Sequence, residues 1–375
     1  MPSNATNDSK EWRTNKIRAE GLPSAAAAAG HGLRKRRGGG VRGMRGRGDR
    51  SVFCRAAAIM LVEMHESQMA PVDLLILGAG WTSTFLIPLL QKEGVTYAAT
   101  TTNGRNGTIP FVFDPDSRDE EPYSRLPHAT TVLITFPLKG KGQSNLLISL
   151  YNTTHSNRHN NSNNDNGGPE THFIQLGVTN IWTNAGWNSE DSPYDTTDSR
   201  AVAEDELMRE AQGAVLSLAG LYGGSRHPRH WVQSGRVAGS KADLRARPAL
   251  HMVHGADVAR GIVAAHRNFT AARRWIVCDM HVYDWWELVQ DCAGEMARGV
   301  AAAVDNGNGD GVEAGCRVSG ADVERGEELL RWVGELMDEE GVRALPRDPS
   351  SLGRMLDGRA FWKTMGVWPM QGRVK

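Results

Sequence analysis

Cysteine and long apolar runs are both scarce in this chain of 375 residues. The four cysteines stand far apart, with no C-x-x-C pair and no spacing typical of a metal site: Cys54, Cys278, Cys292 and Cys316. This excludes a dense disulfide framework and predicts a reduced, cytoplasmic protein. No uninterrupted apolar run approaches the ~20 residues that a transmembrane helix needs, so we expect no membrane partner.

Excess charge is also lacking over the chain as a whole. Lysine plus arginine and aspartate plus glutamate both number 43, a balance that makes nucleic acid an unlikely general partner. The first fifty residues are nevertheless strongly basic, with an alanine run and Arg-Gly repeats. We predict a disordered extension over 1–70, because such a segment buries too little apolar surface to offset its chain entropy. The alternatives are a weakly RNA-binding arm, a mitochondrial presequence, or an over-extended gene start.

The most informative stretch runs from Leu74 to Leu90. Four consecutive aliphatic residues predict a strand buried on both faces, a glycine turn follows, and 84–90 can form a helix. Such a turn aims backbone N–H groups and the positive end of the helix dipole at one point, where a diphosphate can bind. Ser83 stands at the third position of the G-x-G-x-x-G pattern. We therefore predict a dinucleotide site at Gly78, Ala79, Gly80, Trp81 and Thr82.

The next strand, predicted over 95–100, bears on the choice of cofactor. In NAD-preferring folds an acidic residue at this strand end bonds the ribose 2′-hydroxyl, yet none occurs between Glu93 and Asp114. Thr101, Thr102 and Arg105 could instead hold a 2′-phosphate. This favours NADP over NAD, and Arg105 as an ordinary solvated loop arginine is the alternative.

Strands and helices continue to alternate along the chain, which predicts an α/β fold with a doubly wound parallel sheet of the Rossmann type. Further strands are predicted over 109–113, 131–137, 172–177, 214–218 and 274–278, and helices over 143–151, 198–208, 255–265, from 282 and over 327–340. We expect a dinucleotide-binding domain over 71–222, with a disordered Asn-rich insertion at 152–169. A smaller C-terminal α+β substrate domain over 223–375 would carry a Gly-rich insertion at 305–320, and residues 250–280 could complete the sheet.

Ligands in open α/β sheets lie beyond the carboxyl ends of the strands. This places Thr135, Phe136 and Pro137, at the end of the predicted fourth strand, where a nicotinamide ribose is expected. The histidines His155, His159, His251 and His254 are weak metal candidates, because no cysteine or carboxylate cluster joins them. We predict no metal site.

Several motifs in order resemble the extended short-chain dehydrogenase/reductase superfamily, in particular its atypical members of the NAD-dependent epimerase/dehydratase-like type. The motifs are Gly78-Ala79-Gly80, Thr179, Arg200-Ala201-Val202-Ala203-Glu204, Leu218-Ala219-Gly220-Leu221-Tyr222-Gly223 and Val253-His254-Gly255-Ala256-Asp257-Val258-Ala259. The resemblance covers about 71–369. It implies an NAD(P)-binding protein with a small-molecule substrate held between two domains.

The same resemblance implies where catalysis would occur, and there the chain departs from the pattern. Active members use a Tyr-x-x-x-Lys pair, in which the tyrosine exchanges a proton with the substrate and the lysine binds the nicotinamide ribose. Here Thr196 and Arg200 occupy these positions. Arg200 can still donate to a ribose. Tyr194 is a candidate substitute acid, and Thr179 matches the hydroxyl that contacts the substrate oxygen.

Two functions remain open on these observations. One is an NADP-dependent oxidoreductase or epimerase acting on a small carbonyl or sugar-like substrate. The other is a catalytically silent NAD(P)-sensing protein, which the missing Tyr-x-x-x-Lys pair would explain.

Overall fold

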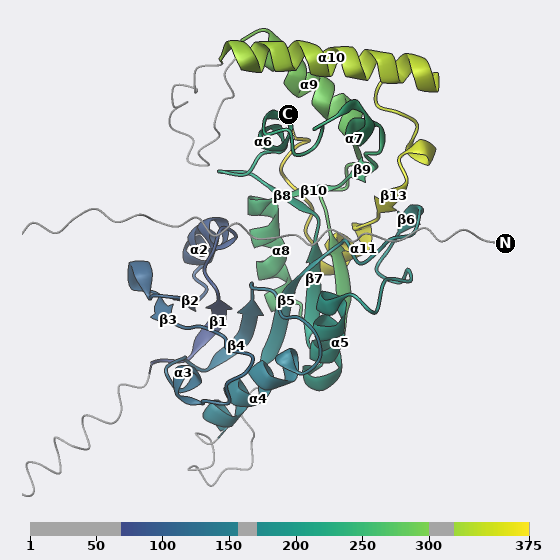
Figure 1. The fold of residues 1–375 in the computed structure, drawn as a ribbon. Coiled ribbons are helices and arrows are strands. Elements are labelled where there is room, and N and C mark those ends of the chain that lie inside the picture. Colours follow the sequence, from purple (N-terminus) through teal and green to yellow (C-terminus); the bar gives the residue numbers. More distant parts are fainter. Residues whose placement is uncertain (1–68, 157–170, 300–318, 375) are drawn as a thin grey trace, which may run out of the picture. The chain divides into compact units, whose positions relative to one another are not determined.

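The computed structural model describes residues 69–156, 171–299 and 319–374. Within them lies a seven-stranded, wholly parallel sheet of order β11-β7-β5-β4-β1-β2-β3 (Figure 1). Its strands are β1 (Val72–Leu77), β2 (Tyr97–Thr101), β3 (Ile109–Pro110), β4 (Ala129–Ile134), β5 (His172–Val178), β7 (Ala214–Leu218) and β11 (Arg274–Val277). The strand order reverses between β1 and β4, the switch point of a doubly wound fold. The predicted Rossmann-like class is confirmed.

Strand β1 is central because both of its faces are buried. Leu74 and Ile76 contribute to one apolar core, and Leu75 and Leu77 to another, as the alternation of side chains along a strand requires. All four side chains are fully buried. A strand with two covered faces needs an unbroken aliphatic run, which this segment has.

Helices cover both faces of the sheet. On the side of Leu74 the core includes residues of α2 (Ser83–Lys92), α8 (Gly255–Arg267) and α11 (Arg359–Met365). On the side of Leu75 it includes residues of α3 (Glu121–Ser124), α4 (Gln143–Ser156) and α5 (Ser199–Ala211). The sheet is thus the middle layer of three, and its carboxyl edge faces the loops that carry the candidate site.

A third apolar core lies outside the sheet and contains Trp285 and Trp286. It is built from α6 (Pro228–Gln233), α7 (Lys241–Arg245), α9 (Trp285–Ala297) and α10 (Gly320–Glu340). Short strand pairs accompany it: β8 (Gly220–Tyr222) with β10 (Met252–His254), β9 (Ala249–Leu250) with β12 (Tyr283–Asp284), and β6 (Gly186–Asn188) with β13 (Arg354–Leu356). Short 3-10 turns occur at Arg105–Gly107 and Pro349–Ser351. The described residues cluster as one unit, and a domain boundary near 222 stays a prediction.

Three predicted boundaries are corrected. The third strand ends at Pro110, which has no N–H to donate, and the chain beyond it leaves the sheet. Residues 152–156 continue α4 instead of starting an insertion. Helix α10 begins seven residues before the predicted 327, where Ser319 and Asp322 form a capping box.

Other expectations fall outside the described residues, namely those on 1–68 and on most of the two predicted insertions. Among the described residues, no helix has both the length and the apolar character needed to cross a bilayer.

Candidate functional site

The turn after β1 is fixed to the ends of two neighbouring strands. The amides of Gly78 and Ala79 donate to the hydroxyl and the carbonyl of Thr100, at 2.9 and 2.6 Å. The Thr135 hydroxyl, after β4, donates to the carbonyls of Leu77 and Gly78 at 3.0 and 2.5 Å. Gly78 has a φ of +95°, and a Cβ there would lie 2.7 Å from the Thr135 Oγ1. Only glycine therefore suits this position.

The turn that leads into α2 leaves two backbone amides without an internal partner, just before the helix begins. The helix has no side-chain cap and no acidic residue in its first turn. The N–H groups of Trp81 and Thr82 donate to no acceptor among the described residues. Beside them, the Ser83 side chain is only 4% exposed and its Oγ has no partner within the described chain. The helix start thus offers donors and a positive dipole end to an anion.

Two other helices start at the same edge of the sheet, and both have internal anions. The buried Glu206 carboxylate accepts from the amides of Gly142, Ser144 and Asn145 at the start of α4. The Asp198 side chain caps α5. Their positive ends are therefore already neutralised, whereas that of α2 is not.

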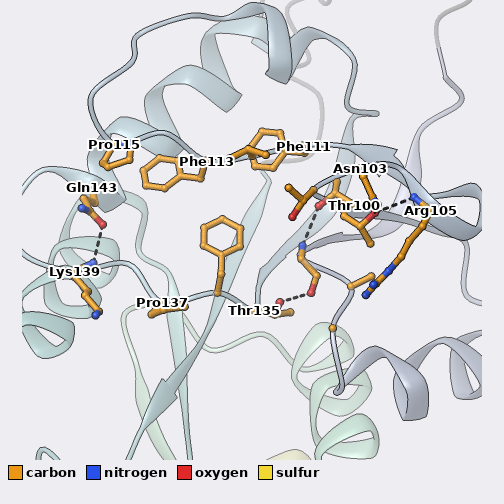
Figure 2. A pocket seen from close by; sticks show the side chains of 17 residues that line it. Thr100, Asn103, Arg105, Phe111, Phe113, Pro115, Thr135, Pro137, Lys139 and Gln143 are labelled. Atoms are coloured by element: carbon orange, nitrogen blue, oxygen red, sulfur yellow. Dashed lines mark hydrogen bonds between the residues drawn. The ribbon is translucent and has the colours of Figure 1, made fainter. Parts of the chain in front are cut away.

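A cavity of 880 Å³ opens beside this turn, beyond the carboxyl ends of β1, β2, β3 and β4 (Figure 2). Its volume lies in the range typical of cofactor sites. No carboxylate is among its lining residues, which include the cations Arg105 and Lys139. Neither cation makes an ion pair with a described residue. The cavity thus suits a ligand with several negative charges.

Most of the predicted cofactor residues line this cavity. They are Gly78, Ala79, Gly80, Thr101, Thr102, Arg105, Thr135, Phe136 and Pro137. The hydroxyls of Thr101 and Thr108 form a hydrogen bond at 2.7 Å, and the Thr101 hydroxyl also accepts from the Arg105 amide at 3.2 Å. These two bonds order the turn that carries Arg105. Three predicted residues, Trp81, Thr82 and Arg200, are not among the lining residues.

Sequence reasoning predicted Phe136 but missed the two other aromatic residues of the cavity wall, Phe111 and Phe113. Phe113 and Phe136 stack with ring centroids 5.9 Å apart and planes 19° from parallel. Phe111 lies beside Phe113 (Figure 2). Two aromatic residues spaced two apart after a strand were the available signal, since such residues point to one side of an extended chain. The remaining missed lining residues are Thr100, Asn103, Val112, Pro115, Lys139 and Gln143.

The predicted catalytic residues are not brought together at this cavity. The Tyr194 hydroxyl donates to the Asp205 carboxylate at 2.7 Å, and burial raises the pKa of Tyr194. Arg200 donates to the Leu176 carbonyl at 2.9 Å. Thr179, next to β5, is buried, and its carbonyl accepts from Arg354 at 2.7 Å. Their catalytic roles stay predictions.

Tyr194 and Arg200 instead belong to a buried ionic network centred on Glu204, which is 0% exposed. Arg274 of β11 pairs with Glu204 and, at 2.8 Å, with Asp205. The Arg274 guanidinium also lies 4.8 Å from the centre of the Tyr194 ring, and the Arg200 Nε is 3.8 Å from Glu204. This network joins α5 to the sheet. Removing one partner of such a pair strongly lowers the stability of the protein, because the other charge is left buried without compensation.

Three of the four histidines considered as metal candidates have local contacts, and the fourth, His159, lies outside the described residues. His155 is buried, and its ring nitrogens contact the carbonyls of Tyr151 and Leu126. His254 caps α8 by accepting from the Ala256 amide, and His251 accepts from the Leu356 amide at 3.0 Å.

No family model matches the sequence, and no match was found among curated proteins. Solved structures of similar fold include a functionally unknown conserved protein from Silicibacter pomeroyi, at 16% identity and TM-score 0.49, covering 81% of this chain and 95% of that one. Another is dTDP-glucose 4,6-dehydratase from Bacillus anthracis in complex with NAD, at 9% identity and TM-score 0.46, covering 80% and 92%. A third is RMD from Pseudomonas aeruginosa complexed with NADPH, at 12% identity and TM-score 0.45, covering 80% and 95%. At these values the fold assignment rests on the strand order of the sheet.

Proposed function

We propose that this protein binds NADP in the cavity beyond β1, β2 and β4, and that it acts as an oxidoreductase or epimerase on a small carbonyl or sugar-like substrate. The observation that carries the proposal is the start of α2, a helix N-terminus without an internal anion. It opens at a strand-order switch point, beside a cavity lined by cations and no carboxylate.

The residues present fit the dinucleotide. Backbone N–H groups at Trp81 and Thr82 are available for the diphosphate, and Gly80 leaves open space, since a Cβ there would touch only the Gly78 carbonyl at 4.0 Å. The stacked Phe113 and Phe136 offer an aromatic face to the adenine, and this proposal replaces the expected position of Phe136 at the nicotinamide ribose. Arg105 is exposed and unpaired with any described carboxylate, as a ligand for the 2′-phosphate requires.

A bound nicotinamide would supply or accept hydride, and the protein must then move a proton at the substrate oxygen. Of the predicted groups, Tyr194 is bonded to Asp205 and Arg200 to the Leu176 carbonyl. This engagement favours a second candidate function, a catalytically silent protein that reports NADP occupancy to a partner. The two candidates share the cofactor and differ in turnover.

Calorimetry with NADPH and NADH tests the shared part of the proposal. We expect the wild-type protein to bind NADPH more tightly than NADH. Arg105→Ala should raise the Kd for NADPH by about 10- to 100-fold and leave the Kd for NADH nearly unchanged, because a charge-assisted bond to phosphate contributes roughly 1.5–3 kcal/mol. Arg343→Ala, an exposed arginine after α10, is the matched control and should change neither value.

If neither NADPH nor NADH produces a binding signal in the calorimeter, the proposal is overturned. If NADPH binds, oxidation of NADPH with a panel of small carbonyl compounds separates the two candidates. Turnover that is lost in Thr179→Ala supports the enzyme. Tight binding without turnover of any panel member supports the silent protein.

A further inference from the structure

The turn that follows β8 packs against the start of α2. Gly223 and Arg226 close this turn through two backbone hydrogen bonds, at 2.8 and 3.1 Å. Gly224, at a φ of +54°, brings the turn close to α2, since a Cβ there would lie 3.5 Å from Phe85 and 4.0 Å from the Trp81 Nε1. A segment more than 130 residues away in sequence is thereby held beside the proposed diphosphate site.

Arg226 projects from this turn over Trp81. Its guanidinium carbon lies 4.5 Å from the centre of the indole ring. Arg226 is exposed to solvent, and it forms no ion pair with any described residue. Partial burial of the side chain lowers the pKa of Arg226, but an arginine stays charged in proteins. The indole thus holds a cation that has no anionic partner in the described chain.

Trp81 connects this cation to the two open amides that precede α2. Its own N–H is one of the two backbone donors without an acceptor, and its buried indole Nε1 also has no partner within the described residues. The dipole of a helix start is equivalent to only about half a positive charge, whereas a diphosphate carries about two negative ones. Arg105 and Lys139 lie in the cavity on the side of β2 and of the loop after β4. A further cation beside Trp81 would complete the neutralisation.

We propose that Arg226 binds the diphosphate of the dinucleotide, reaching it from the turn after β8 while the amides of α2 bind it from the other side. This inference rests on the proposed NADP site and adds a residue that the glycine turn alone does not predict. Arginine is suited to the role because its planar guanidinium can make two parallel bonds to phosphate oxygens. The stack on Trp81 would hold that plane before the ligand arrives, which lowers the ordering cost of binding.

Calorimetry with two probes tests the assignment. NADPH contains the diphosphate, whereas adenosine 2′-monophosphate contains the base and the 2′-phosphate but lacks it. Arg226→Ala should raise the Kd for NADPH by about 10- to 100-fold and leave the Kd for adenosine 2′-monophosphate unchanged. Arg226→Lys keeps the charge but loses the planar guanidinium that can make two parallel bonds. It should therefore raise the Kd for NADPH by a smaller factor than Arg226→Ala. Arg343→Ala is again the control for loss of an exposed arginine.

The outcomes distinguish this inference from the function on which it rests. If wild type and Arg226→Ala bind NADPH equally, Arg226 is only a packing residue and the inference is overturned, while the NADP site stands. An equal loss of affinity for both probes would also overturn it, because the effect would then not lie at the diphosphate. If the wild type binds neither probe, the proposed function fails and the inference fails with it. Thermal unfolding of each variant confirms that the comparison is between folded proteins.

Discussion

The two halves of the sheet use the polar side chains around them in different ways. Beyond β1, β2 and β4, the amides of α2 and the cations Arg105 and Lys139 have no internal anion among the described residues. Against β5, β7 and β11, Arg274 at the start of β11 pairs with Glu204 of α5 in a buried network. The first arrangement leaves binding capacity for a ligand, and the second uses charge to join α5 to the sheet. Stability and ligand binding should therefore respond to different substitutions.

The largest effect is expected from Glu204→Ala. The change leaves the Arg274 guanidinium buried without its main partner and should lower the free energy of unfolding by about 3–5 kcal/mol. Glu210→Ala on the same helix removes an exposed pair with Arg209 and should cost less than about 1 kcal/mol. Urea unfolding measures both. Equal effects of the two variants would show that the network contributes no more than a surface pair.

The next effect concerns pH and His251. Burial lowers the pKa of this imidazole to about 4, from an ordinary value of 6.5. Between these values the unfolded chain takes up a proton that the folded protein does not, so stability falls as pH drops from 7 to 4. The titration of His251 should lower the free energy of unfolding by about 3 kcal/mol between pH 7 and pH 4.

Urea unfolding at pH 7 and pH 4 measures this contribution by comparison with His251→Gln. Glutamine can accept from the Leu356 amide as the imidazole does, but it does not titrate. The variant should lose about 3 kcal/mol less than the wild type over the interval. An identical loss in both proteins would assign the acid sensitivity to other groups.

The ligand-binding half is tested by Gly78→Ala. At a φ of +95° an alanine is strained, and its Cβ would lie 2.7 Å from the Thr135 Oγ1, which is bonded to β1. We expect a loss of stability of about 2 kcal/mol and at least a tenfold rise in the Kd for NADPH. Gly94→Ala, also at a positive φ but with no atom within 4 Å, should cost about 1 kcal/mol and leave the Kd unchanged. If Gly78→Ala binds NADPH with the wild-type Kd, the turn after β1 is not part of the nucleotide site.

The strand and the turn beside the cavity follow from the sequence because their signals are local. Four aliphatic residues before Gly78 specify a doubly buried strand, and the absence of an acidic residue after β2 is visible without a structure. The other half depends on partners far apart in the chain. Arg274 meets Glu204 across seventy residues, and the motif alignment that placed Arg200 at a ribose could not show that Leu176 and Glu204 engage it. Phe113 was expected on a strand that ends earlier, at Pro110.

The smallest expected effect is that of Tyr194→Phe, and it bears most directly on the difference between the halves. Removing the hydroxyl deletes its bond to Asp205 and should lower the free energy of unfolding by about 1 kcal/mol. Tyr97→Phe, which deletes an exposed bond to Gln91, should cost less. The Kd for NADPH should be unchanged in both variants, because neither hydroxyl lines the cavity. If Tyr194→Phe weakens NADPH binding or abolishes turnover without loss of stability, Tyr194 acts at the cofactor, and the network half of the sheet takes part in function as well as in folding.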